Sequence, residues 1–361
     1  MKLLFFASDY KIGLSSLLTQ QAIALQKGNL NPICLSGENE QEPGLAGKMQ
    51  RNGLFLIKME GLDEHSHFRE LSRKIGMMIH LNRIDRVHVQ NNWQLLLVAF
   101  YKYKNITPQP FQIIYTLHGF RHNNPFKSII ATLLIGLILF LFADKIIVMS
   151  DYVKKRFFFL SYKIKKLYLG IDDSYFEKTK NEIAVTPLKL VFPAQFREGK
   201  NQNILIEAVG SYIDTTGDST IELHLPGEGA LLNQCKKLVQ KKKIEKNIFF
   251  SGQCTKLQIQ DLYEQCNIGV ISSNTETFGQ SIVEPFVLGR TVLTRKVGVA
   301  PDIIKEGVNG YFFDNKEDLL EKLIFLSSNK ELIKNMGDTN FSQRETFSWE
   351  AITTLYKKDI K

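Results

Sequence analysis

Short apolar runs alternate with longer amphipathic stretches along the chain. In the first half, the first run is followed by a loop and then by a predicted helix, which Ser15 or Ser16 caps and Gly28 ends. The runs that predict strands in this half are residues 3–7, 31–35, 86–90, 113–117 and 145–149. Such alternation is typical of a parallel sheet with helices on both faces.

A second series of the same kind begins after the polar segment 177–187, which is the best candidate for a linker. Its predicted strands are residues 189–193, 222–225, 248–251, 269–272 and 291–294, and its predicted helices are 203–212, 231–243 and 256–265. Two successive doubly wound halves are the simplest assembly of this pattern. Because such sheets bind ligands outside the carboxyl ends of their strands, we expect the site in a cleft between the halves.

Composition narrows the class of protein. With 361 residues, 44% of them hydrophobic, the chain has enough apolar material for two packed cores, and disorder is excluded. The four cysteines are scattered, which argues against a disulfide framework or a zinc site and favours a reducing compartment. The net charge of +9 favours anionic partners, which leaves phosphorylated small molecules, anionic lipids and nucleic acid open.

The most apolar stretch is residues 129–143. As a helix it would be about 22 Å long, shorter than the roughly 30 Å hydrocarbon core of a bilayer. A buried core helix and a helix exposed to a membrane surface both remain open, and a membrane span is the third reading. Basic residues nearby support the membrane surface: Arg121, Lys127, Lys154, Lys155, Arg156, Lys163, Lys165 and Lys166. At the amino terminus, the apolar run 3–7 is too short for a signal peptide.

Residues 272–285 combine carboxylates, glycine and a predicted helix start directly after a predicted strand. Glu276 and Glu284 are eight residues apart, with Phe278 and Gly279 between them. Gly279 lets the backbone approach a ligand, and the amides of the following helix suit a diphosphate. The alternative is an exposed loop in which Glu276 is an ordinary charge at a helix amino terminus. Residue types alone leave both readings open.

The segment ETFGQSIVE, followed by Pro285, resembles the donor-binding signature of the family 4 retaining glycosyltransferases. Further segments resemble the family in order: Gly13 after the first strand, His88 and His118 at strand ends, residues 143–150 and 169–172 around the domain crossing, the turn 226–229 with Gly227, Gly298, and residues 347–350. The resemblance implies the GT-B architecture, in which two Rossmann-like domains face a central cleft. The implied domains are residues 1–180 for the acceptor, 187–340 for the nucleotide sugar, and 341–361 as a helix that returns to the first domain.

The resemblance also implies roles for single residues. Glu284 would hold the ribose hydroxyls, Glu276 the hydroxyls of the transferred sugar, and the amides of Phe278 and Gly279 the sugar or phosphate. His118 would act beside Glu276 and Lys200 in catalysis; the alternative for it is a satisfied histidine at a strand end. The remaining residues implied at the donor are Gly13, Arg197, Gly227 and Gly298.

Positive charge at the diphosphate is the chemical requirement of such a reaction, because the leaving group is a nucleoside diphosphate. The family carries Gly-Arg-x4-Lys after the first strand of its second domain. Lys200 matches the lysine, but Gln195 occupies the arginine position, and Arg197 lies two residues further on. Taken alone, Lys200 is more simply a solvated surface lysine.

The sequence therefore predicts a retaining hexosyltransferase that uses a nucleoside-diphosphate sugar, with UDP expected, and a glycan or lipid-linked saccharide acceptor in surface polysaccharide or lipopolysaccharide synthesis. No metal or other cofactor is expected, since Asp172 and Asp173 lack a third carboxylate at ligand spacing. We expect a cytoplasmic protein with peripheral contact to an anionic membrane through residues 127–166. The lysines of residues 236–246 lack interleaved aromatics, so no nucleic acid is expected. The alternatives are a sugar-nucleotide epimerase or phosphorylase on the same fold, and a non-catalytic protein that binds membrane or nucleic acid.

Overall fold

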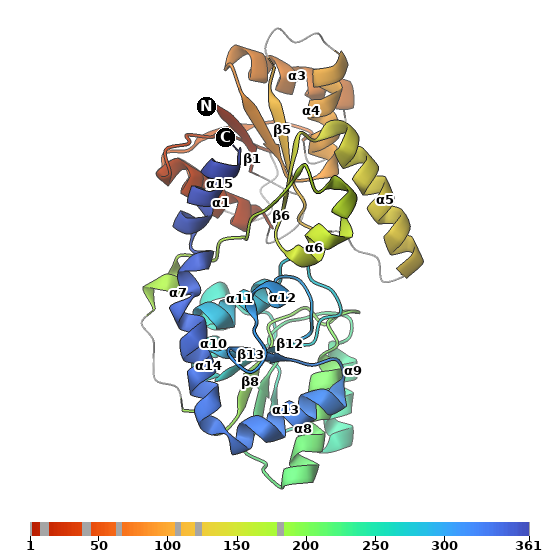
Figure 1. Ribbon diagram of the computed structural model, residues 1–361, viewed down its shortest axis with the longest axis vertical. Helices are drawn as coiled ribbons and strands as arrows, with labels where there is room; N and C mark the ends of the chain where they lie inside the picture. The colour runs from red at the N-terminus through yellow and green to blue at the C-terminus, as the bar shows by residue number, and fades with distance from the viewer. Residues whose placement is uncertain are drawn as a thin grey trace. The chain divides into compact units, whose positions relative to one another are not determined.

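The computed structural model describes residues 2–7, 14–37, 45–62, 67–104, 110–119, 125–178 and 184–360. The chain divides into two compact units (Figure 1). Unit 1 comprises Met1–Met149, Val153–Gly170 and Trp349–Lys361, and unit 2 comprises Ser150–Tyr152 and Ile171–Ser348. The chain thus leaves unit 1 after Gly170 and returns to it at Trp349, which begins the last helix.

Unit 1 contains a seven-stranded sheet in which every neighbouring pair is parallel, in the order β3-β2-β1-β4-β5-β6-β7. The strands are β1 (Leu3–Phe6), β2 (Ile33–Ser36), β3 (Phe55–Lys58), β4 (Arg86–Val89), β5 (Gln112–Thr116), β6 (Lys145–Val148) and β7 (Ile164–Lys166). The central strand β1 is buried along its whole length, as expected of a strand covered on both faces.

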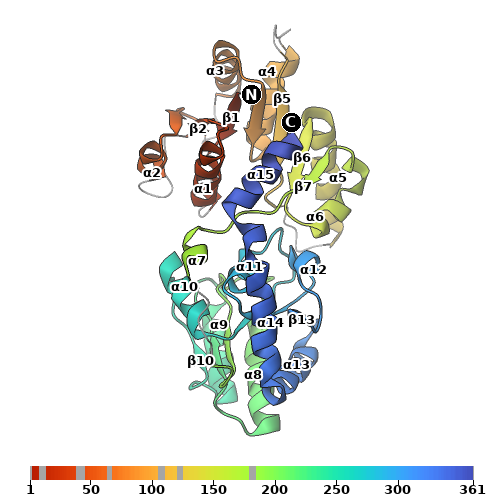
Figure 2. The same cartoon turned by 60° about the vertical axis from the view of Figure 1, so that its left-hand side comes forward.

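The helices of unit 1 connect these strands, except for the last helix α15 (Figure 2). They are α1 (Leu14–Lys27), α2 (Leu45–Arg51), α3 (Phe68–Leu81), α4 (Asn92–Lys104), α5 (Pro125–Phe142), α6 (Asp151–Arg156, whose first two residues are grouped with unit 2), the 3-10 helix η1 (Phe158–Leu160) and α15 (Trp349–Ile360). Helix α15 packs against the end of α1, where a Cβ on Gly28 would lie 2.5 Å from Cγ2 of Thr353. The absence of a side chain at Gly28 therefore permits this close approach.

Unit 2 repeats the architecture with six parallel strands in the order β10-β9-β8-β11-β12-β13. The strands are β8 (Lys189–Val191), β9 (Glu222–His224), β10 (Ile248–Phe249), β11 (Ile268–Ile271), β12 (Thr291–Thr294) and β13 (Gly310–Phe312). Its helices are α7 (Ser174–Glu177), α8 (Gln202–Thr216), α9 (Leu232–Lys242), α10 (Lys256–Gln265), α11 (Gln280–Val287), α12 (Ala300–Ile303), α13 (Lys316–Ser328), α14 (Lys330–Ser342) and η2 (Arg344–Phe347).

Both sheets have the strand order of a Rossmann-type fold, which confirms the two doubly wound halves predicted from the alternation. The order reverses between β1 and β4 in unit 1, and between β8 and β11 in unit 2. The carboxyl ends of strands at such a reversal are the usual ligand-binding position of open parallel sheets. In unit 2, the loops that leave β8 and β11 contain most of the residues singled out in the sequence.

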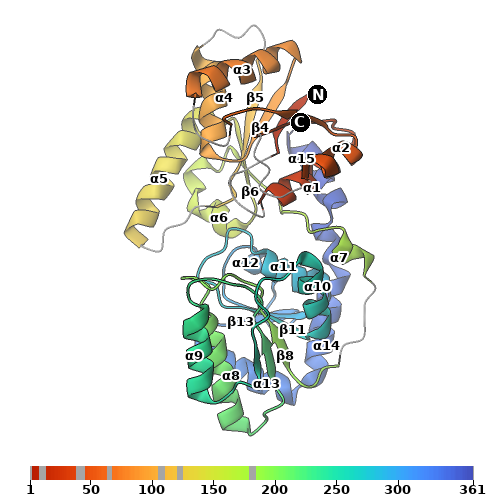
Figure 3. The same cartoon turned by 180° about the vertical axis from the view of Figure 1, so that it is seen from behind.

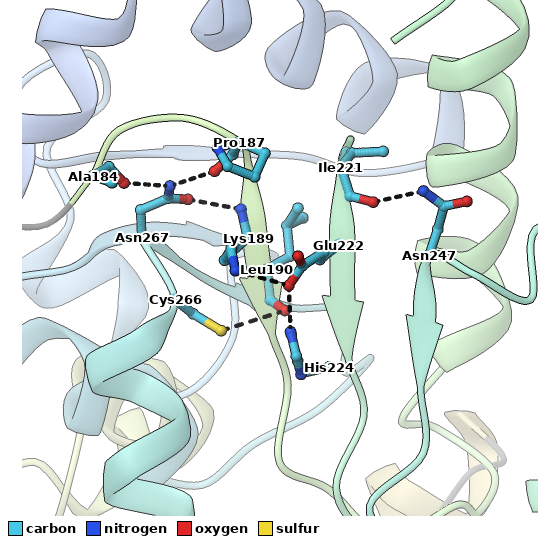
Figure 4. Close-up of polar contacts among 10 residues, drawn as sticks. All are labelled: Ala184, Pro187, Lys189, Leu190, Ile221, Glu222, His224, Asn247, Cys266 and Asn267. Atoms are coloured by element: carbon cyan, nitrogen blue, oxygen red, sulfur yellow. Dashed lines mark hydrogen bonds and ion pairs between the residues drawn. The ribbon is translucent and has the colours of Figure 1, made fainter. Parts of the chain in front are cut away.

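The opposite edge of the unit 2 sheet is held together by side chains at the amino ends of its strands (Figure 4). Asn267 donates from Nδ2 to the carbonyl oxygens of Ala184 and Pro187, and its Oδ1 accepts from the amide of Lys189. On the face of the sheet, Oε2 of Glu222 lies 3.1 Å from Nζ of Lys189 and 3.1 Å from Nε2 of His224. These contacts fix the end of the predicted linker to β8 at the edge opposite the loops that contain most of the residues singled out in the sequence.

The apolar stretch 129–143 lies almost wholly in α5, and the structure does not bury most of it. Four of its residues are buried, namely Thr132, Gly136, Leu139 and Ala143, whereas seven of its large apolar residues are 43–59% exposed. The buried-helix reading is therefore wrong for most of this stretch. Among the helices of the described residues, none is long and apolar enough to cross a membrane.

Candidate functional site

The loop after β8 and the loop after β11 meet through an ion pair. Nζ of Lys200 lies 2.5 Å from Oε1 of Glu276, and the two side chains are only 13% and 16% exposed. The reading of Lys200 as a solvated surface lysine is therefore wrong, and so is the reading of Glu276 as an exposed helix charge. The two residues that the resemblance assigns to phosphate and sugar lie side by side in unit 2.

Backbone and amide contacts hold the two loops in this arrangement. Asn201, in a left-handed conformation with φ of 56°, donates from Nδ2 to the carbonyl oxygen of Ser272 and to Oδ1 of Asn274. The amide of Asn274 in turn donates to the carbonyl oxygen of Gly199. The hydroxyl of Ser272 donates to the carbonyl oxygen of Lys200. Lys200 is thus positioned on both sides by contacts between the loops.

Arg295 is a second cation at this edge that sequence reasoning missed. It follows β12 directly, and its Nη1 lies 2.5 Å from Oδ1 of Asn274. The signal for it was available, since a charged residue directly after a buried strand lies at the carboxyl edge of a parallel sheet. Lys200 and Arg295 are therefore joined through the Asn201–Asn274 contact.

Gly298 and Gly279 allow backbone segments of the site to pack closely or to turn. A Cβ on Gly298, whose φ is 55°, would lie 2.3 Å from the carbonyl oxygen of Phe278 and 3.0 Å from Cβ of Glu276. The same carbonyl accepts from the amide of Val299. Gly279, with φ of 91°, precedes α11 and turns the chain into that helix. The Phe278 ring is buried against Phe347, so its backbone rather than its ring borders the site.

Glu284 lies further along α11, in contact with two tyrosines. Burial raises the pKa of its carboxyl to about 7, and hydrogen bonds from the hydroxyls of Tyr263 and Tyr175 act against that rise. Burial also raises the pKa of both tyrosine hydroxyls, so they remain protonated donors. A carboxylate held in this way can accept hydrogen bonds from neighbouring hydroxyls. Neither tyrosine was identified from the sequence, because nothing in their local pattern marks them.

The glycine-rich turn after β9 packs on the loop after β8. A Cβ on Gly227 would lie 2.1 Å from the carbonyl oxygen of Ala194, and φ at Gly227 is 141°. The neighbouring Gln195, at the family's arginine position, is exposed. Arg197 donates from Nη1 to the carbonyl oxygen of Glu198. Gly227 therefore contacts the start of the loop that carries Lys200.

In unit 1, the predicted His88 lies within β4, and the predicted His118 lies two residues after the end of β5. His118 Nε2 lies 2.7 Å from Oε1 of Gln90, the residue after β4. His88 is buried, with Nε2 2.6 Å from Thr116 Oγ1 and Nδ1 2.8 Å from the hydroxyl of Tyr356 in α15. Burial lowers the pKa of His88 to about 3, so it is neutral. Gly13, predicted at the donor, lies outside the described residues.

The structure thus brings together five of the predicted residues in unit 2, namely Lys200, Glu276, Phe278, Gly279 and Gly298. Glu284 lies on the helix that continues from them, and His118 belongs to unit 1. Within the part of the chain that is described, no group of three or more His, Cys, Asp or Glu side chains could hold a metal ion. The cluster can neutralise a bound anion through Lys200 and accept hydrogen bonds from hydroxyls through Glu276 and Glu284.

Comparison with known proteins agrees with the sequence motifs. The profile of the family glycosyl transferases group 1 matches residues 173–343. An uncharacterized glycosyltransferase of Methanocaldococcus jannaschii is 28% identical over 216 residues, which cover 58% of this chain and 56% of that protein. The poly(ribitol-phosphate) alpha-N-acetylglucosaminyltransferase of Staphylococcus aureus is 28% identical over 141 residues, which cover 38% of this chain and 28% of that protein. The matched segments thus span about half or less of these two relatives.

Solved structures show the same fold over the whole chain. The Anabaena protein HepE, in complex with UDP, superposes with a TM-score of 0.80 at 17% sequence identity, covering 100% of this chain and 99% of HepE. At that identity the likeness shows the fold alone, and it confirms the GT-B architecture expected from the sequence. The family profile confirms the resemblance in the second unit. Residues 173–343 therefore match the model of the glycosyl transferases group 1 family, on a chain with the two-sheet GT-B fold.

Proposed function

We propose that this protein is a retaining hexosyltransferase that moves a sugar from a nucleoside diphosphate, with UDP as the nucleotide, to a glycan acceptor. The observation that carries the proposal is the Lys200–Glu276 pair at the carboxyl edge of the unit 2 sheet, beside the close-packed Gly298 and Phe278 backbone. A cation and a carboxylate in contact suit a ligand that has phosphate on one side and hydroxyls on the other. HepE, which shares the fold, is also known in complex with UDP-glucose.

Lys200 has the main chemical task in this proposal. As the bond between the sugar and the diphosphate breaks, negative charge grows on the leaving phosphate, and a positioned ammonium stabilises it. The contacts of Asn201 and Ser272 fix the loop before the donor binds, so little reorganisation is needed. Arg197, in the loop after β8, and Arg295, directly after β12, are further cations of unit 2, and either would compensate for Gln195 at the arginine position. Stabilisation of the leaving phosphate by these cations requires no metal ion.

The carboxylates and the backbone would orient the donor. Glu284 would accept hydrogen bonds from the ribose hydroxyls, and Glu276 from the hydroxyls of the transferred sugar. The amides of Phe278 and Gly279 would support the sugar or the phosphate, as would Gly227, Gly298 and Gly13 through close backbone approach. Charge-assisted hydrogen bonds of this kind contribute about 1.5–3 kcal/mol each. In unit 1, His118 would act on the acceptor side, held by Gln90.

The acceptor and the pathway complete the proposal. We propose a lipid-linked saccharide acceptor, in the assembly of surface polysaccharide or lipopolysaccharide at the cytoplasmic face of a membrane. The Staphylococcus aureus relative, a poly(ribitol-phosphate) alpha-N-acetylglucosaminyltransferase, supports a polymer of the cell surface as the acceptor class.

A thermal-shift screen of the full chain against UDP, GDP, ADP, CDP and dTDP tests the proposal. UDP at 100 times its dissociation constant should add about 2.7 kcal/mol to the free energy of unfolding. Glu284→Ala should abolish the shift, whereas Glu245→Ala, at an exposed glutamate of the same unit, should retain it. Equal stabilisation of both variants by UDP would overturn the assignment of Glu284. A wild type that no nucleotide stabilises would overturn the proposed donor class.

A further inference from the structure

Helix α5 has its apolar and polar faces reversed relative to an ordinary surface helix. An amphipathic helix of a globular protein normally turns its apolar stripe toward the core. In α5 the buried stripe is largely small or polar, since it consists of Ser128, Thr132, Gly136 and Leu139. Ile135, Ile138 and Phe142 are intermediate in burial. The exposed side carries seven further large apolar residues, which are Ile129, Ile130, Leu133, Leu134, Leu137, Phe140 and Leu141, each 43–59% exposed.

Specific contacts hold the helix in this reversed orientation. The guanidinium of Arg156 in α6 donates to the hydroxyls of Thr132 and Ser128 on the inward side of α5. Gly136 lies under the ring of Phe159, because a Cβ there would be 2.5 Å from that ring. Rotating α5 to bury its leucines would break both contacts. The exposed apolar face is therefore the orientation that the neighbouring elements select.

The apolar surface continues from α5 onto η1. The Phe158 side chain is 72% exposed and that of Tyr162 is 65% exposed, and Phe159, which contacts Gly136, is 40% exposed. We call the exposed residues of α5 together with these three the α5–η1 surface. In Figures 1 and 3, α5 runs along the flank of unit 1 with no other element outside it. Contiguous apolar surface of this kind on a soluble unit marks an interaction site.

Basic residues are concentrated in the segment of the chain that carries the α5–η1 surface. Residues 125–170 contain eight Lys and Arg but only two Asp, so this eighth of the chain carries +6 of the net charge of +9. Nζ of Lys163 donates to the carbonyl oxygens of Phe140 and Ala143 and lies 5.4 Å from the Phe140 ring and 5.9 Å from the Tyr162 ring. Lys155 and Lys165 are exposed. Positive charge thus directly adjoins exposed apolar side chains.

We propose that the α5–η1 surface docks the protein onto an anionic lipid bilayer. Apolar side chains would enter the boundary between head groups and acyl chains, and the lysines would contact anionic head groups. A second copy of this chain is a less suitable partner for the surface, because a twofold interface would bring the basic residues of segment 125–170 against the same residues of the other copy. The helix is about 27 Å long, so it would lie in the plane of the membrane surface. This proposal stands independently of the proposed enzymatic activity.

Vesicle sedimentation of the full chain tests the proposal, with phosphatidylcholine vesicles that contain or lack phosphatidylglycerol. The wild type should pellet with the anionic vesicles. Leu133→Ser/Leu137→Ser should weaken this partition at least about tenfold, because two leucines leave the apolar boundary. Lys155→Glu/Lys165→Glu should weaken binding to anionic vesicles selectively, and raised salt should do the same. Leu81→Ser/Leu257→Ser, at leucines 79% and 66% exposed elsewhere, is the matched control and should bind as the wild type does.

Three further readouts separate this proposal from its competitors. The leucine variant should keep its melting temperature, its elution volume without lipid, and its UDP-induced thermal shift if the wild type has one. A wild type that stays in the supernatant, or a leucine variant that still pellets, would overturn the proposal. A lower melting temperature of the variant would assign the leucines to a core, and a dimer that the variant dissociates would assign the surface to a second copy. A wild type that pellets but binds no nucleotide would refute the proposed function alone.

Discussion

Nζ of Lys200 and Oε1 of Glu276 lie 2.5 Å apart, although 76 residues separate them in the chain. The contact joins the loops that follow β8 and β11, the two strands at which the order of the unit 2 sheet reverses. In the proposed reaction, a donor phosphate would replace Glu276 as the partner of Lys200. The carboxylate would then be released for the sugar hydroxyls.

Lys200→Met is expected to reduce turnover far more than donor affinity. The ammonium already has Glu276 as a partner before the donor binds, so the net gain on binding is small, whereas it would stabilise the negative charge that develops on the leaving phosphate. By analogy with the loss of one charge-stabilising donor, kcat should fall by about 100-fold or more while the donor dissociation constant changes by less than about tenfold. Steady-state kinetics and calorimetric titration with the donor measure the two quantities.

Glu276→Gln is the companion of the lysine variant, because it removes the negative charge of the partner carboxylate and keeps the shape of that side chain. If Lys200 acts only in ground-state binding, Lys200→Met would lose affinity and turnover by the same factor. The double variant should show non-additive effects, since the two side chains are in direct contact.

Nucleotide affinity should rise with pH around neutrality. The pKa of Glu284 is raised to about 7 by burial, and only the ionised carboxylate accepts hydrogen bonds from both ribose hydroxyls. Between pH 6 and pH 8 the ionised fraction rises about tenfold, so the dissociation constant for UDP should fall by up to that factor. Calorimetric titration at several pH values measures this slope. UDP also titrates, so the comparison is with Glu284→Gln, whose slope should contain only the nucleotide's share.

The same carboxyl group should make the unliganded protein less stable as pH rises. Its folded pKa of about 7 lies above the ordinary value of 4.5, so the folded state retains a proton that the unfolded state releases between these two values. The free energy of unfolding therefore falls as pH rises from about 4.5 to 7 and is constant above that range as far as this group is concerned. Urea unfolding at pH 5 and pH 8 should show a smaller loss for Glu284→Gln than for the wild type. An unchanged loss would mean that this carboxyl is not the titrating group.

Both sheets could be predicted from the sequence because most of their central strands are continuous apolar runs. In the structure these runs form strands, as predicted. Strands β3, β7 and β13 were not predicted. β3 is half exposed, β7 contains two lysines in three residues, and β13 begins with a glycine and has two partly exposed residues, so none of them has the apolar signature of a buried strand. The Glu276–Glu284 spacing could be recognised because it is local. The partners Tyr175, Tyr263 and Arg295 are distant in sequence and reach the site only through the fold.

In unit 1, the hydroxyl of Tyr356 joins α15 to the sheet through His88 and Thr116. Tyr356→Phe would leave a buried ring nitrogen of His88 without a partner, which costs about 1–3 kcal/mol of unfolding free energy. Tyr103→Phe removes a hydroxyl from a tyrosine that is 60% exposed, and it should have little effect. Urea denaturation of both variants gives the comparison, and equal stability of the two would show that the buried contact contributes nothing.

Gly298→Ala should disrupt the donor site as well as the fold around it. The added Cβ would lie 2.3 Å from the carbonyl oxygen of Phe278, and relief of that clash requires the segment carrying Glu276 and Phe278 to move. Gly217→Ala is the matched control, because Gly217 also has a positive φ, of 72°, but no atom lies within 4 Å of the position that its added Cβ would occupy. Strain in the backbone alone should cost Gly217→Ala about 1 kcal/mol. Gly298→Ala should lose more than that and should also lose the UDP-induced thermal shift, which Gly217→Ala should keep. Equal destabilisation of the two variants, with nucleotide binding intact in both, would show that the close packing of Gly298 does not position the donor loop.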